Sequence, residues 1–235
     1  MATAIQTIQT PFGAASVQPA SKGQTLIHTI ANWKWLPSLV MGGMAIVVAI
    51  GLGIAQAAAA NDLRDGFSAS SQSDFETLKP LTAGTLFLGE ALVLSGISFL
   101  LATILGALRR GGGEVQESTG ALVKTLKMPW SAWAFLALMM AGVMAQAVAF
   151  GGLIYVATQA HDAWAGASAA GIPADLGAFN TAATWSAWAN PLREVSLGLL
   201  LGGIAFALYT ISNVLGFQFT RIRELIQGDE EGVNS

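Results

Sequence analysis

Four long apolar blocks constrain this sequence more than any other feature. They cover residues 36–58, 81–108, 131–157 and 195–219, and Glu90 is the single charged residue inside them. A helix needs about 20 apolar residues to cross about 30 Å of hydrocarbon. Backbone groups in lipid must be satisfied within the segment, and barrel strands are shorter and alternate in polarity. The sequence therefore predicts an all-α integral membrane protein with four transmembrane helices.

Composition excludes several kinds of chemical site and partner. Only 11% of the residues are charged, whereas soluble domains carry about 25%. The absence of cysteine excludes disulfides, thiolate metal sites and iron–sulfur ligation. A net charge of −3 gives no reason to expect nucleic acid as a partner.

Catalytic patterns are also missing from the sequence. There is no HExxH motif, no pair of aspartates inside the apolar blocks and no Ser/His couple there. His28 and His161 are expected on opposite sides of the membrane, so they cannot hold one metal or one haem within a single chain. We predict no cofactor, no metal and no catalytic residues, and an enzyme is the less favoured class.

Basic residues predict how the chain is oriented. Of the 11 Lys and Arg residues, eight fall in segments that share one side of the membrane if all four blocks cross it. Positive residues are retained in the cytoplasm, so both termini are predicted to be cytoplasmic. The Ala- and Gly-rich style and the lack of a standard secretory signal favour a bacterial inner membrane. The eight are Lys22, Lys34, Arg109, Arg110, Lys124, Lys127, Arg221 and Arg223.

The two halves of the chain share a sequence pattern. A shift of 100 residues aligns 33–62 with 133–162 without a gap, and 12 of the 30 positions are identical, Trp, Met and Asp among them. A shift of 107 residues aligns 96–104 with 203–211, where six of nine positions agree. These matches predict an internal duplication, in which two tandem two-helix hairpins have the same orientation.

This duplication divides the chain into five segments. We expect a polar N-terminal arm (1–32), a first transmembrane hairpin (33–108), a cytoplasmic loop (109–129), a second hairpin (130–220) and a cytoplasmic C-terminal tail (221–235). The glycine run that follows Arg110 is expected to end the second span.

Small residues recur at four-residue spacing in these hairpins. Such stripes let helix backbones approach closely, either within the chain or against another subunit. The candidate packing residues are Gly198 and Gly202, the aligned Ala91 and Ser95, and Ala45, Ala49 and Gly53 in the first block.

Glu90 is the candidate ion or proton site. An ionisable residue at this depth is costly and often marks an ion or proton path. The alternative is a structural glutamate that reaches Arg193 or a hydroxyl on a neighbouring helix. Gln146 and Asn213, also deep in the spans, are expected to bridge helices by hydrogen bonds.

Three tryptophans lie between the third and fourth blocks. Trp164, Trp185 and Trp188 fall in the segment 158–192, which we expect to be an outer loop. They either rest at the lipid interface or form a partner surface.

The function predicted first is that of a non-catalytic multi-pass membrane protein, an accessory or scaffold subunit of a larger membrane complex. Its expected partners are membrane lipid and other membrane subunits or further copies of the chain. One alternative is a small transporter or channel that uses Glu90. A weaker alternative is a quinone- or lipid-binding subunit of a membrane enzyme.

Overall fold

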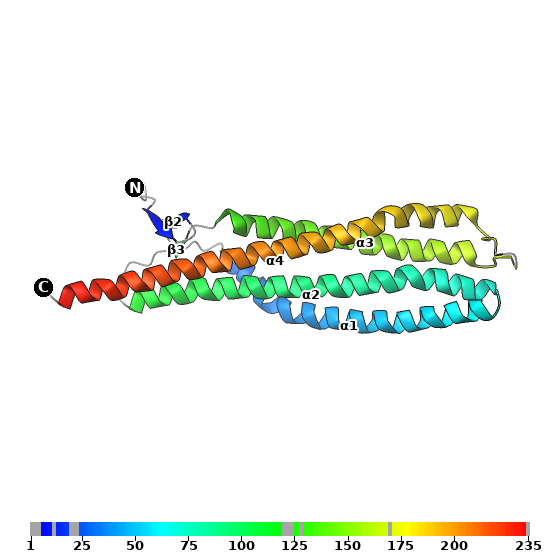
Figure 1. The fold of residues 1–235 in the computed structure, drawn as a ribbon, viewed down its shortest axis with the longest axis horizontal. Coiled ribbons are helices and arrows are strands. Elements are labelled where there is room, and N and C mark those ends of the chain that lie inside the picture. Colours follow the sequence, from blue (N-terminus) through cyan, green and yellow to red (C-terminus); the bar gives the residue numbers. More distant parts are fainter. Residues whose placement is uncertain are drawn as a thin grey trace. The chain divides into compact units, whose positions relative to one another are not determined.

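The described part of the protein is all-helical apart from one small sheet. A computed structural model describes residues 6–10, 13–18, 24–118, 125–126, 129–168 and 171–233. Four helices carry most of them: α1 (Gln24–Asp65), α2 (Ala69–Ser118), α3 (Trp130–Trp164) and α4 (Leu176–Val233), drawn in Figure 1. Each contains a stretch that is long and apolar enough to cross a membrane. The prediction of an all-helical protein with four candidate spans is therefore confirmed.

The helices extend well beyond the apolar blocks. α2 does not end at the glycine run, as expected from the sequence, but continues to Ser118. Glycine weakens a helix by about 1 kcal/mol relative to alanine, which packing can offset. Here the Gln218 side chain of α4 donates a hydrogen bond to the Leu108 carbonyl and lies against Gly112. The glycine thus allows a close approach between helices.

The connection between α3 and α4 is also shorter than expected. The segment 158–192 is mostly helical, because α3 ends at Trp164 and α4 begins at Leu176. Asp175 caps α4, since its Oδ1 accepts hydrogen bonds from the backbone N–H groups of Gly177 at 2.7 Å and Ala178 at 3.0 Å. The C-terminal segment, expected as a tail, is helical as far as Val233.

The Asp175 cap gives a local prediction. We expect Asp175→Ala to cost about 1 kcal/mol and to speed hydrogen exchange in the first turn of α4 by about fivefold. Asp175→Asn keeps a side-chain oxygen acceptor and should leave exchange almost unchanged. Equal exchange in all three proteins would show that this cap does not hold the helix start.

The chain forms two compact units, and each of the four helices contributes residues to both. The first unit comprises Met1–Trp35, Ile97–Ala137 and Gly202–Ser235, and the second comprises Leu36–Gly96 and Leu138–Leu201.

The first unit contains the sheet, which was not predicted from the sequence. Strands β1 (Gln6–Thr10), β2 (Gly13–Gln18) and β3 (Thr125–Leu126) pair antiparallel in the order β1-β2-β3. Val17 lies opposite Leu126, so the N-terminal arm pairs with the connection between α2 and α3.

α3 and α4 also pack together in the first unit. The hydroxyl groups of Ser131 and Thr210 are 2.8 Å apart and buried. Beside them, the rings of Trp130 and Phe206 meet edge to face at 5.3 Å between centroids. A buried polar bridge between two apolar helices fixes their register, because an unpaired hydroxyl there would be costly.

The second unit is held by close helix packing at small residues. A Cβ atom added to Gly42 of α1 would lie 2.8 Å from the Gly89 carbonyl oxygen and 2.8 Å from Val93 on α2. On the other hairpin, the Ser196 hydroxyl of α4 donates to the Gly142 carbonyl of α3 at 3.0 Å. The small residues at these positions bring the helix backbones into close contact, as is common where apolar helices pack together.

α2 is also packed against α3 in this unit. Gly84 of α2 lies against Leu153, and Ser73 near the start of α2 contacts His161 near the end of α3, at 3.1 Å between Oγ and Nδ1. Phe87 and Ala91 of α2 are 1% and 0% exposed. The second unit is therefore packed around α2, which contacts α1 and α3 through different faces.

Candidate functional site

Glu90 lies on the exposed side of α2. Its neighbours in the sequence, Phe87 and Ala91, face inward and are fully buried, while Leu86 is 40% exposed. Within the described residues the Glu90 carboxylate has neither a hydrogen bond nor an ion pair, so the expected contact with Arg193 is not formed. Arg193 instead pairs with the adjacent Glu194 at 2.6 Å. The carboxylate thus stands on an apolar outer surface without a partner from the described part of this chain.

The candidate packing residues fall into two groups. Ala91 and Ser95 are buried in the second unit, as is Ala49, whereas a Cβ atom on Gly198 would meet nothing within 4 Å. Gly198 therefore makes no close helix contact within the described chain. The remaining candidates, Ala45, Gly53 and Gly202, are partly buried. Of these, Gly53 faces Thr82 of α2.

The three tryptophans expected either at the lipid interface or in a partner surface lie in two separate clusters. Trp185 contacts Trp188 and Tyr155, each at 4.9 Å between ring centroids, so these rings pack between α3 and α4. Trp164 instead meets Phe179 edge to face at 6.1 Å. All of these rings project from helices and not from a loop.

The two polar residues expected to bridge helices differ in burial. Gln146 of α3 is buried at 6% exposure, and Asn213 of α4 is partly buried. Their bridging role stays a prediction. Buried polar bridges are formed by Ser196 and by the Ser131–Thr210 pair. Hydroxyl side chains deep in apolar helices are the sequence signal that could have found them.

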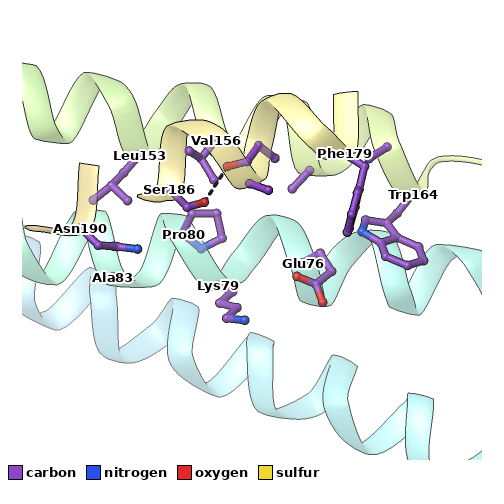
Figure 2. Close-up of a pocket in the computed structure, with 14 residues that line it drawn as sticks. Glu76, Lys79, Pro80, Ala83, Leu153, Val156, Trp164, Phe179, Ser186 and Asn190 are labelled. Atoms are coloured by element: carbon purple, nitrogen blue, oxygen red, sulfur yellow. Dashed lines mark hydrogen bonds between the residues drawn. The ribbon is translucent and has the colours of Figure 1, made fainter. Parts of the chain in front are cut away.

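A pocket lies among α2, α3 and α4 in the second unit, as Figure 2 shows. It has a volume of about 320 Å³, which is at the lower end of the range for small-molecule sites. Its charged and amide side chains are those of Glu76 and Lys79 on α2 and Asn190 on α4. Apart from Ser186, the remaining lining residues are apolar or aromatic: Pro80, Ala83, Leu153, Val156, Ala160, Ala163, Trp164, Phe179, Ala182 and Ala183.

Glu76, one of the charged residues of this pocket, makes few hydrogen bonds within the described part of the protein. Glu76 accepts one long hydrogen bond of 3.4 Å from the Gln72 amide. Pro80 has no N–H, so it cannot donate the helical hydrogen bond that the Glu76 carbonyl would otherwise accept. Glu76 and Lys79 were not predicted as site residues, although their three-residue spacing just before an apolar block puts them on one helix face at the expected membrane surface.

Four apolar helices packed through small residues and hydroxyl bridges define this chain as a candidate multi-pass helical membrane protein. Comparisons with protein-family models, with curated proteins and with solved structures find no match to it. Its function is therefore argued from the geometry described above.

Proposed function

We propose that this chain is a non-catalytic membrane protein that acts as an accessory or scaffold subunit of a larger membrane complex. In this proposal it spans a bacterial inner membrane four times, with both termini in the cytoplasm. Other helices of the complex cover part of the apolar surface of α1 and α2.

The main observation that supports this proposal is the exposed position of Glu90. A charged side chain at the centre of a bilayer costs about 2.5–3.5 kcal/mol on insertion scales. Such residues normally face the interior of a bundle, where hydrogen bonds lower that cost. Glu90 faces outward with exposed Leu86 beside it, so a helix from another subunit that donates a hydrogen bond there would remove the penalty.

α1 adds apolar surface for such contacts. Only 11% of the most apolar stretch of α1 is buried within the chain, a smaller share than in any of the other three candidate spans. Glycines at positions 43 and 51 leave open space beside the helix, where a neighbouring backbone could approach closely. The large exposed side chains of this span are Leu36, Val40, Met41, Met44, Val47, Val48, Ile50 and Ile54.

Packing contacts support the internal duplication. Gly42 meets Gly89 and Val93, and Gly142 meets Ser196 and Leu200. The shift of 100 residues relates the two glycines, and the shift of 107 relates both pairs of partners. Contacts between α1 and α2 thus recur at matching positions between α3 and α4, as expected for two similar hairpins.

Two further contacts support one orientation for both hairpins. In the second unit, Ser73 bonds to His161 and Phe67 lies near Gly171, so the two helix connections lie at the same end. In the first unit, β2 and β3 join the N-terminal arm to the α2–α3 connection. Each pair of segments is predicted on the same side of the membrane by the positive-inside rule.

The transporter alternative has less support. The buried polar residues of the described chain are uncharged, and Glu90 lies outside this interior. A path through the middle of one chain would therefore not include Glu90. A path that uses it would need a second protein against α2.

Extraction in mild detergent followed by native mass spectrometry tests the proposal. We expect tagged wild-type chain to carry other membrane proteins in fixed stoichiometry. Glu90→Leu should reduce their recovery at least tenfold, which corresponds to about 1.4 kcal/mol of lost contact energy. Glu194→Gln is the matched control, because it neutralises an exposed carboxylate that already has a partner in Arg193.

Two results would contradict the proposal. Wild-type chain that appears alone or as a homo-oligomer would overturn the accessory role. Equal loss of partners from Glu90→Leu and Glu194→Gln would overturn the role of Glu90. In the first case, a pH-dependent flux in proteoliposomes that Glu90→Gln abolishes would establish the transporter alternative.

A further inference from the structure

We propose that the pocket among α2, α3 and α4 binds the headgroup of a zwitterionic phospholipid that carries an ammonium and a phosphate, such as phosphatidylethanolamine. This inference requires that the chain lie in a membrane, but it does not depend on the accessory role. It goes beyond the lipid contact that any membrane protein makes, because it assigns a specific site.

The ammonium would lie between Glu76 and the aromatic wall. Figure 2 shows Glu76 on α2 at the same end of the pocket as Trp164 and Phe179, and all three residues line it. The Trp164 and Phe179 rings meet edge to face, at an interplanar angle of 85°. A carboxylate and an indole ring that line the same pocket favour a cation through charge and through the cation–π interaction.

The protein itself supplies no cation to this carboxylate. Within the described residues, Glu76 has no ion pair, and its only side-chain hydrogen bond comes from neutral Gln72. Pro80, which also lines the pocket, cannot donate the usual helical hydrogen bond to the Glu76 carbonyl. A carboxylate and an aromatic ring together suit a primary ammonium, which has three N–H donors.

The phosphate would lie near Lys79. This residue is one helical turn beyond Glu76 and is exposed at the edge of the pocket. Lys79 has no ion pair within the described part of the chain. The Glu76 carboxylate and the Lys79 ammonium thus lie on one helix face without forming an ion pair with each other. Such a pair of opposite charges matches a ligand that carries both an ammonium and a phosphate.

The apolar walls indicate an amphiphile and not a free zwitterion. Leu153, Val156 and Ala83 line the pocket next to these charged groups, and Ala83 lies inside the apolar block of α2. Glu76 and Lys79 precede that block, at the level where headgroups are expected. The pocket thus places headgroup chemistry just outside the hydrocarbon and apolar walls just inside it.

Lipid titration of the full-length chain tests this site. Purified, delipidated protein in detergent is titrated with phosphatidylethanolamine or phosphatidylglycerol, and bound lipid is counted by native mass spectrometry. We expect one phosphatidylethanolamine to bind at least tenfold more tightly than phosphatidylglycerol. Glu76→Gln should weaken it about tenfold, as expected for the loss of one charge-assisted contact, and Glu76→Asp should retain most of the affinity.

Asp74→Asn provides the matched control. Asp74 is an exposed carboxylate on the same helix that does not line the pocket, so its neutralisation should leave lipid binding unchanged. Equal affinities for wild type and Glu76→Gln, or equal binding of both lipids, would overturn the site. Displacement of the lipid by an equal concentration of free phosphoethanolamine would overturn its assignment to a lipid.

Discussion

Asn61→Cys and Ser168→Cys are each expected to react fully with a membrane-impermeant maleimide on intact cells, whereas Gly111→Cys and Gln227→Cys react only after permeabilisation. The chain has no cysteine, so each variant carries one thiol. All four positions are exposed in the structure. An all-or-none difference is expected because the maleimide cannot cross the bilayer, and gel-shift labelling measures it.

These four positions test both hairpins separately. Asn61 lies within the first hairpin and Gly111 just after it, and Ser168 lies within the second hairpin and Gln227 just after it. If Asn61→Cys and Ser168→Cys react from opposite sides, the hairpins are inverted and the tandem arrangement is wrong. If all four reactivities are reversed, the hairpins are parallel but the positive-inside assignment of the termini is wrong.

Gly42→Leu is expected to give the largest loss of stability among single substitutions on α1. Even a Cβ atom at this position would come within 2.8 Å of the Gly89 backbone and of Val93. Overpacking typically costs 1–3 kcal/mol, and more where backbone is the obstacle, so we expect about 3 kcal/mol or more. Unfolding of the chain by SDS titration in mixed micelles measures this change.

Gly43→Leu is the control for this substitution. Gly43 is the adjacent residue, but a Cβ atom there would meet nothing within 4 Å. Its replacement adds helix propensity and apolar surface, so we expect unchanged or slightly higher stability. An equal loss in both variants would mean that the close contact between α1 and α2 does not form.

The four candidate spans could be predicted because the sequence signal for each of them is local. Each apolar block is longer than a membrane is thick, and the charges lie outside the blocks apart from Glu90. The ends of the helices could not be predicted as well, since they depend on distant residues. The continuation of α2 past Arg110 depends on contact with Gln218, more than 100 positions away in the chain.

The candidate sites could also be predicted only in part, because their surroundings depend on residues distant in the sequence. Glu90 could be placed inside the second block from the sequence, but not on the outward side of α2, because one helix face is distinguished from another only by its neighbours. Trp185 was predicted in a loop, and the Asp175 cap ten residues earlier is the sequence signal for a helix start that could have corrected this. The pocket joins Glu76 to Trp164 and Asn190 across three helices, a proximity that no local pattern indicates.

The pairing of β2 with β3 bears on the order of events during synthesis. Val17 and Leu126 are separated by roughly 100 residues, which makes this one of the most non-local contacts in the chain. β3 leaves the ribosome only after the complete first hairpin has been made. In the proposed membrane topology, α1 and α2 would insert while the β1–β2 pair of the N-terminal arm still lacks its third strand. The sheet can be completed only after β3 has emerged, and the contact between β2 and β3 then closes a chain loop that contains the first hairpin.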